Sequence, residues 1–194
     1  MEQFQSYLKS TISESDFQSL SSLLIEKTVE KGETLLRAGD ICNHSFFVES
    51  GLLRSYSLDA GGKEHVIQFA PENWIISDRS SVLFREPSEF YIDSIEKTNI
   101  IMFDNDFVDK ASEISPKYRE FNQKALNNHI RHQQQRINRL LSATAEERYL
   151  NFIELYPNIS LRVPQWMIAS YLGITPESLS RVRKELSRKN FKEN

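Results

Sequence analysis

The feature that most constrains this chain is a stretch near its C-terminus, residues 165–184, with the pattern of two short helices joined by a tight turn. Gly173 stands at the turn, where a left-handed residue is needed to end the first helix. Thr175 is a good N-cap for the second helix, and Pro176 fits its first position because no backbone N–H is needed there. The apolar and small residues expected between the two helices are Ile168, Ala169, Leu172, Ile174, Leu179 and Val182. Together they predict a helix-turn-helix, with an ordinary helical hairpin as the weaker alternative.

The free side of the second helix carries groups that suit DNA. A helix-turn-helix reads base edges with residues near the start of its second helix. Arg181 can donate two hydrogen bonds to guanine, and Glu177 can accept one from cytosine or orient Arg181. Hydroxyl groups and further basic side chains would contact phosphates, with Arg188 and Lys189 adding nonspecific attraction. The candidate DNA-binding residues are Thr175, Glu177, Ser178, Ser180, Arg181, Arg183 and Lys184.

The charge distribution agrees with this interpretation. Residues 162–192 hold seven basic and only two acidic side chains, a charge of +5. Since the net charge of the whole chain is −3, the remainder carries −8. A basic end on an acidic body is typical of a protein that places that end on phosphates, although a solvated basic tail gives the same charge.

The middle of the chain has a different texture, with short β-like runs separated by glycine-containing turns. Residues 4–26 precede it and show the apolar spacing of one or two short helices. The predicted strands cover residues 34–36, 45–48, 52–58, 65–69, 91–95 and 100–103. Many short strands with glycine at the joints predict an antiparallel β-barrel or jelly roll rather than a parallel sheet.

A long helix is predicted over residues 117–141, which contain no glycine or proline. Leu126, Ile130, Ile137 and Leu141 are spaced almost like a coiled-coil seam, so this helix is a candidate dimerisation element. Alternatively, it lies on its own barrel. Thr144 and Glu147 match a capping box for a following helix. We therefore predict an effector domain over 1–115, a dimerisation helix over 116–141 and a DNA-binding domain over 142–194.

Three segments, residues 31–39, 46–54 and 162–183, resemble the Crp/Fnr family of bacterial regulators, and the order of elements agrees over nearly the whole chain. The resemblance implies an α+β fold: a cyclic-nucleotide-binding-like barrel, a long dimerisation helix and a (winged) helix-turn-helix. It also implies a homodimeric transcription regulator bound to a palindromic operator in double-stranded DNA, with RNA polymerase as a candidate partner.

The resemblance extends to single positions. Glu177 and Arg181 match the family's base-reading pair, and Thr175 matches its phosphate-contacting turn residue. Another reading position falls at Pro176, which has no group to hydrogen-bond a base. Many family members continue into a β-hairpin wing, and here any wing has to come from Ile159 to Val163.

The effector pocket departs from the family pattern. Cyclic-nucleotide binders hold the phosphate with a Gly-Glu pair and a nearby arginine, but this chain has Glu89, Phe90 and Tyr91 where the arginine is expected. A carboxylate there would repel a phosphate. We therefore expect a degenerate pocket with an unknown effector, unless Arg79 substitutes for the missing arginine. The candidate pocket residues are Trp74, Ser77, Asp78, Arg79, Glu89 and Tyr91.

The sequence predicts neither a cofactor nor a metal site. The single cysteine, Cys42, is expected to be a small buried residue and cannot supply an iron–sulfur cluster. His129 and His132 share a helix face without an identifiable third ligand, and His44 and His65 are isolated.

Two other function classes were weighed against the regulator. A ligand-binding or protein-interaction module without DNA binding is the principal alternative, whereas an enzyme would need a metal cluster or a nucleophile and base that the sequence lacks. No signal peptide or membrane span is predicted, so we expect a cytoplasmic protein.

Overall fold

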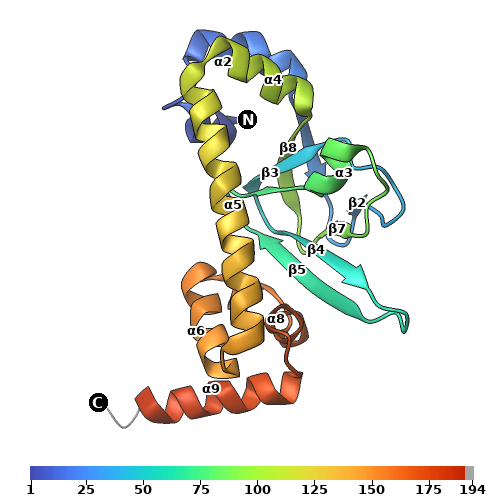
Figure 1. The fold of residues 1–194 in the computed structure, drawn as a ribbon, viewed down its shortest axis with the longest axis vertical. Helices are drawn as coiled ribbons and strands as arrows, with labels where there is room; N and C mark the ends of the chain where they lie inside the picture. Colours follow the sequence, from blue (N-terminus) through green and yellow to red (C-terminus); the bar gives the residue numbers. More distant parts are fainter. Residues whose placement is uncertain (191–194) are drawn as a thin grey trace. The chain divides into compact units, whose positions relative to one another are not determined.

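A computed structural model describes residues 1–190 (Figure 1). Its contacts form two compact units, one of residues 1–63 and 67–127, the other of residues 64–66 and the chain from residue 128 onward. The strands are β1 (Ile25–Val29), β2 (Thr34–Leu36), β3 (Ser45–Ser50), β4 (Leu53–Leu58), β5 (Glu64–Ala70), β6 (Ile75–Ile76), β7 (Tyr91–Ser94) and β8 (Thr98–Phe103). The helices are α1 (Glu2–Leu8), α2 (Glu14–Leu20), α3 (Arg79–Phe84), α4 (Asn105–Ile114), α5 (Pro116–Ser142), α6 (Ala145–Leu155), α7 (Ile159–Arg162), α8 (Gln165–Leu172) and α9 (Pro176–Asn190), with a 3-10 turn over Ser21–Leu23.

The first unit is built on two four-stranded sheets, in the orders β1-β8-β3-β6 and β2-β7-β4-β5. The strands pair antiparallel, as in β3 with β8 and β4 with β7. Because side chains alternate along a strand, β3 directs Phe46 and Val48 to one core and Phe47 to another. Phe46 and Val48 pack with Leu53 and Ile92 of the second sheet. The predicted antiparallel barrel is confirmed.

Helices cover the opposite face of the β1-β8-β3-β6 sheet. Phe47, Ile101 and Phe103 project from that face and are fully covered by α1, α2, α4 and the start of α5. Phe4 of α1 lies against the rings of Phe47 and Phe103, at centroid distances of 4.9 and 5.4 Å. This outer apolar layer ties the N-terminal helices to the sheet.

The second unit is helical and begins within α5. The predicted capping box of α6 is present: the Glu147 backbone N–H donates to Thr144 Oγ1 at 3.2 Å, and Thr144 N–H donates to the Glu147 carboxylate at 2.8 Å. Arg136 of α5 donates from Nη2 to the Tyr171 carbonyl at the end of α8 at 3.0 Å, and its guanidinium lies 4.4 Å from the Tyr171 ring centroid. Helices α5 and α8 are thereby joined.

The stretch that was left for a wing is helical. Residues 159–163 form α7 and its C-cap rather than a β-strand. Ile159 and Val163 are both buried while Leu161 is 88% exposed. A strand would turn Leu161 to the same side as its two neighbours, whereas a helix places residues four apart together and Leu161 opposite. Between residues 142 and 190 the structure contains no strand.

Candidate nucleic-acid interface

The turn between α8 and α9 has the geometry that its sequence requires. Gly173 adopts the left-handed conformation, with φ 66° and ψ 36°, and its N–H donates to the carbonyls of Ala169 and Ser170. Helix α9 then begins at Pro176. The Ser178 N–H donates to Thr175 Oγ1 at 3.2 Å, as expected of an N-cap threonine. The start of α9 is therefore fixed by local hydrogen bonds.

The underside of α9 is buried and its outer side is open. Leu179 and Val182 are buried, and the elements in contact with α9 are α6 and α8. Glu177, Arg181 and Lys184 are all exposed. Their spacing of four and three residues places them on one face, opposite Leu179 and Val182. The structure thus brings three predicted DNA-binding residues together on a single outward face.

Arg188 belongs to the same outward face, although the sequence suggested only a nonspecific role for it. It follows Lys184 by four residues and is exposed. The sequence could have indicated this, because Arg188 follows Arg181 by seven residues and Lys184 by four, which are helical intervals. Within residues 1–190, Arg181, Arg183, Lys184 and Arg188 form no salt bridge, so their charges stay available. Lys189 instead binds the Glu146 carboxylate at 2.7 Å.

The other predicted residues lie at the edges of this face. Ser180 and Arg183 are exposed on the flank of α9, while Ser178 is half-buried. The Thr175 hydroxyl donates to Ser178 Oγ at 3.2 Å, so the two hydroxyl groups face each other at the helix start.

Glu177 is held in its charged form. Its pKa is lowered by hydrogen bonds from its own backbone N–H and from the Thr175 side chain, and by the charge of Arg181. An ionised Glu177 can only accept hydrogen bonds, and Arg181 can only donate them. The pair therefore offers one acceptor and one fixed donor group side by side.

Helix α5 leaves several large apolar side chains uncovered in the single chain. Ile130, Ile137 and Leu141 are 55%, 58% and 83% exposed. They lie on one side of α5 by their helical spacing, as does the half-buried Leu126. Such a stripe is typical of a helix that pairs with another helix.

Comparison with known proteins identifies this arrangement. Residues 26–113 match the family model described as "Cyclic nucleotide-binding domain". The transcriptional activator protein FnrA of Stutzerimonas stutzeri is 29% identical over 167 residues, covering 80% of this chain and 68% of the relative. The fumarate and nitrate reduction regulatory protein of Vibrio cholerae is 27% identical over 187 residues, covering 89% and 73%. In sequence the chain is similar to Fnr-type regulators of the Crp/Fnr family. It is a transcription regulator and not an enzyme.

Solved structures agree on the Crp/Fnr fold. FixK2 from Bradyrhizobium japonicum superimposes with a TM-score of 0.73 at 20% identity, covering 86% of each chain. A CooA mutant from Carboxydothermus hydrogenoformans gives a TM-score of 0.71 at 21% identity, covering 91% of this chain and 82% of that one.

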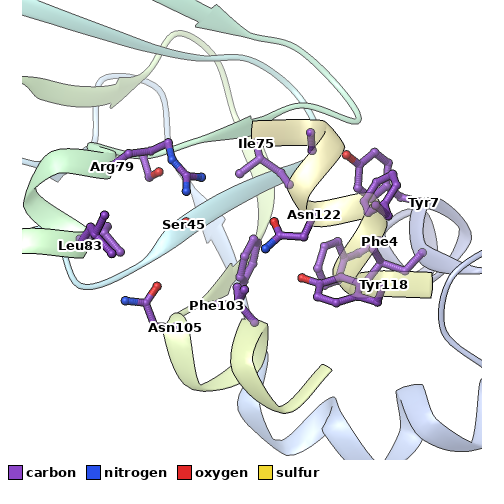
Figure 2. A pocket seen from close by; sticks show the side chains of 16 residues that line it. Phe4, Tyr7, Ser45, Ile75, Arg79, Leu83, Phe103, Asn105, Tyr118 and Asn122 are labelled. Atoms are coloured by element: carbon purple, nitrogen blue, oxygen red, sulfur yellow. The ribbon is translucent and has the colours of Figure 1, made fainter. Parts of the chain in front are cut away.

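The candidate effector residues of this Crp/Fnr barrel do not converge on one site. Asp78 is buried and caps α3, accepting hydrogen bonds from the N–H groups of Ser80 and Ser81 and from the Ser88 hydroxyl. Glu89 is exposed, and Trp74 packs on the core between the sheets. Ser77 and Arg79 line one cavity, together with residues of the helix-covered face such as Phe103. Figure 2 shows Arg79 and Phe103 in its wall.

Tyr91 lies in a different group, on β7. Its ring stacks on Tyr56 of β4 at 5.2 Å, next to a buried ion pair in which Arg54 donates to Asp93 at 2.8 and 2.9 Å. By strand register these four residues face away from Leu53 and Ile92. Arg54, the buried arginine of this sheet, is thus already bound to a carboxylate.

The remaining titratable candidates have ordinary structural surroundings. Cys42 is buried and its thiol contacts the His44 carbonyl at 3.3 Å; burial raises its pKa. His129 and His132 are exposed on α5. Among the described residues no three His, Cys, Asp or Glu side chains come together as metal ligands, and no helix is long and apolar enough to span a membrane.

Proposed function

We propose that this Crp/Fnr regulator binds a palindromic operator as a homodimer, reading each half-site with the outward face of α9. The observation that carries the proposal is the row of unpaired, exposed charges on α9 above a buried underside. A helix fixed in this way can enter the major groove without losing internal contacts. The DNA it reads would be the chromosome in the bacterial cytoplasm.

Some residues of this face would contact bases and others phosphates. Arg181 would donate to guanine O6 and N7, and Glu177 would accept from cytosine N4 on a neighbouring base pair or hold Arg181 in position. Lys184 and Arg188 would meet phosphates further along α9, and Arg183 and Ser180 would do so from its flank. Thr175 and Ser178 would contact phosphate at the start of the helix.

Dimerisation through α5 would account for its exposed apolar stripe. Pairing would remove Ile130, Ile137 and Leu141 from water, and each side chain so buried contributes about 1.5–3 kcal/mol. A twofold dimer would present two copies of α9 to half-sites roughly 34 Å apart, one turn of the duplex. RNA polymerase remains a candidate further partner.

Cyclic nucleotide binding in the family's usual manner is not part of the proposal. The amide groups at the start of α3 already bind the Asp78 carboxylate, and Arg54 is bound to Asp93. A phosphate placed there would meet the negative charge of Asp78, and the buried arginine of the second sheet is already paired.

Selection of duplexes from a random library at about 0.15 M salt tests the DNA-binding proposal. We expect enrichment of an inverted repeat, with affinity that falls steeply as salt rises. If no duplex is retained, the chain is instead a ligand-binding or protein-interaction module.

Sedimentation of wild type and Ile137→Asp tests the dimer. We expect the variant to be monomeric and to lose binding to the full repeat, whereas Gln135→Asp, on the opposite side of α5, should behave as wild type. A wild-type monomer would overturn the dimer but leave DNA binding by single half-sites to be measured on the selected duplex.

A further inference from the structure

A cavity of about 100 Å³ lies in the first unit, on the helix-covered face of the β1-β8-β3-β6 sheet. Its walls come from α1, β3, β6, α3, β8, α4 and the first turns of α5 (Figure 2). The barrel core between the two sheets is a separate cluster of residues. The cavity is therefore distinct from the core between the sheets, although two of the predicted effector residues, Ser77 and Arg79, line it.

The cavity wall contains one charged side chain, Arg79, and no carboxylate. Within residues 1–190 Arg79 forms neither a hydrogen bond nor an ion pair through its side chain. Its sequence neighbour Asp78 is engaged by Ser80, Ser81 and Ser88. Partial burial lowers the pKa of Arg79, yet an arginine keeps its charge at any physiological pH. The wall thus holds a positive charge that no group of the described chain neutralises.

Neutral hydrogen-bonding groups accompany this charge. Figure 2 shows the Arg79 guanidinium of α3 and the Asn122 amide of α5 directed into the same space. Ser45 and Asn105 also line it, and within residues 1–190 their side chains have no hydrogen-bond partner. Tyr118 contributes a phenol whose pKa is raised by burial and by Tyr7, so it stays a neutral donor. These groups can bind a negatively charged oxygen.

The rest of the wall is apolar. Its apolar lining residues are Phe4, Phe103, Val108 and Phe121, together with Val82 and Leu83 of α3. Leu83 is 66% exposed although it borders the cavity, so a ligand would find apolar surface that still contacts water. Covering such surface stabilises a complex by about 25 cal/mol per Å².

We propose that this cavity binds a small organic monocarboxylate, with its carboxylate on Arg79 and its apolar body against the phenylalanine rings. A carboxylate matches the planar guanidinium with two parallel hydrogen bonds. A single cation in an apolar wall suits a monoanion better than a phosphate dianion. A cavity of 150 Å³ holds a benzene molecule, six heavy atoms, in another protein, so about four heavy atoms fit inside a cavity of about 100 Å³. That is the size of a short alkyl chain, whose carboxylate would lie at the exposed Arg79. The assignment concerns the first unit alone and does not depend on DNA binding.

Calorimetric titration of the full chain with propionate and with butyrate tests the proposal. We expect saturable binding of one molecule per chain, with butan-1-ol, the neutral analogue of butyrate, binding at least about tenfold more weakly, as expected for loss of a charged hydrogen bond. Absence of saturable heat with both carboxylates at millimolar concentration overturns the proposal.

Two variants and one control locate the site. Arg79→Gln should weaken butyrate binding about tenfold or more and leave butan-1-ol unchanged, whereas the control Arg85→Gln, in the same α3 region but outside the cavity wall, should leave both unchanged. Ala125→Phe should fill the cavity and weaken both ligands. If circular dichroism shows folded Arg79→Gln and it binds butyrate like wild type, the assignment to Arg79 is wrong.

Discussion

Helices α3 and α9 begin in similar ways, yet their first turns differ in charge. Both are capped by a side-chain oxygen, but the cap of α3 is the Asp78 carboxylate and that of α9 is the neutral Thr175 hydroxyl. A helix N-terminus favours anions. In α3 the capping carboxylate meets that preference, whereas the cap of α9 is neutral and the acidic residue of its first turn, Glu177, lies among basic residues that form no salt bridge within residues 1–190. The comparison teaches that a phosphate site requires cations that the protein itself leaves unpaired.

The internally satisfied charges of the barrel should give the largest mutational effect. Arg54→Ala leaves Asp93 buried without its partner, and we expect the free energy of unfolding to fall by about 3–5 kcal/mol in urea titrations. Lys97→Ala is the control, because it breaks the exposed pair with Glu30 and should cost less than about 1 kcal/mol. If Arg54→Ala and Lys97→Ala lowered the free energy of unfolding equally, the buried ion pair of the barrel would be no more stabilising than an exposed one.

The exposed basic side chains of α9 should affect the affinity for DNA strongly and the stability of the fold only slightly. Arg181→Ala should reduce affinity for the selected duplex by about 1–3 kcal/mol and relax preference at one base pair, measured by fluorescence anisotropy. Arg183→Ala, on the flank, should weaken binding to all duplexes alike. Unchanged affinity and unchanged base preference in Arg181→Ala would exclude Arg181 as a base reader.

Exchanging the cap chemistry tests the comparison directly. Thr175→Asp gives α9 the same kind of cap as α3, and we expect equal or greater stability, by roughly 0.3–1 kcal/mol in thermal unfolding. The added charge would face phosphates, so affinity for any duplex should fall several-fold at low salt. Thr175→Asn keeps the cap without the charge and should retain DNA binding. Full DNA affinity in Thr175→Asp would break the proposed link between cap charge and phosphate binding.

The smallest effect should come from Glu177. Its folded-state pKa is lowered, so its contribution to stability is present above the pKa of the unfolded chain, near 4.3, and is lost as pH falls through the lower folded value. The difference in melting temperature between wild type and Glu177→Gln should therefore be seen at neutral pH and vanish below about pH 4. If this difference in melting temperature grew as the pH fell, the lowered pKa of Glu177 would be contradicted. Glu113→Gln on α4 serves as the exposed control.

The helix-turn-helix could be predicted almost residue by residue because each position obeys a local rule. Gly173, Thr175 and Pro176 act through backbone conformation and capping, which depend on neighbours in sequence. The long helix α5 was predictable for the same reason. The capping box of α6 was equally local.

Elements defined by packing were less predictable. Helix α4 was missed although Phe107, Val108 and Ala111 have helical spacing, whereas β6, at two residues, is too short to have a pattern of its own. The sequence left open whether Ile159 to Val163 form a wing, because so short a stretch has no pattern that decides between helix and strand. Burial of Ile159 and Val163 together selects the helix. The cavity beside Arg79 joins residues from α1 to α5, a combination that no local pattern indicates.

Arg136 has a consequence for the DNA sequence that the protein selects. Its hydrogen bond and ring contact make the end of α8 turn with α5, and α9 follows through the fixed turn at Gly173. A change of one residue in the helical phase of α5 amounts to about 100°, enough to turn the reading face out of the groove. The number of base pairs between the operator half-sites would then depend on the angle at which α9 is held relative to α5.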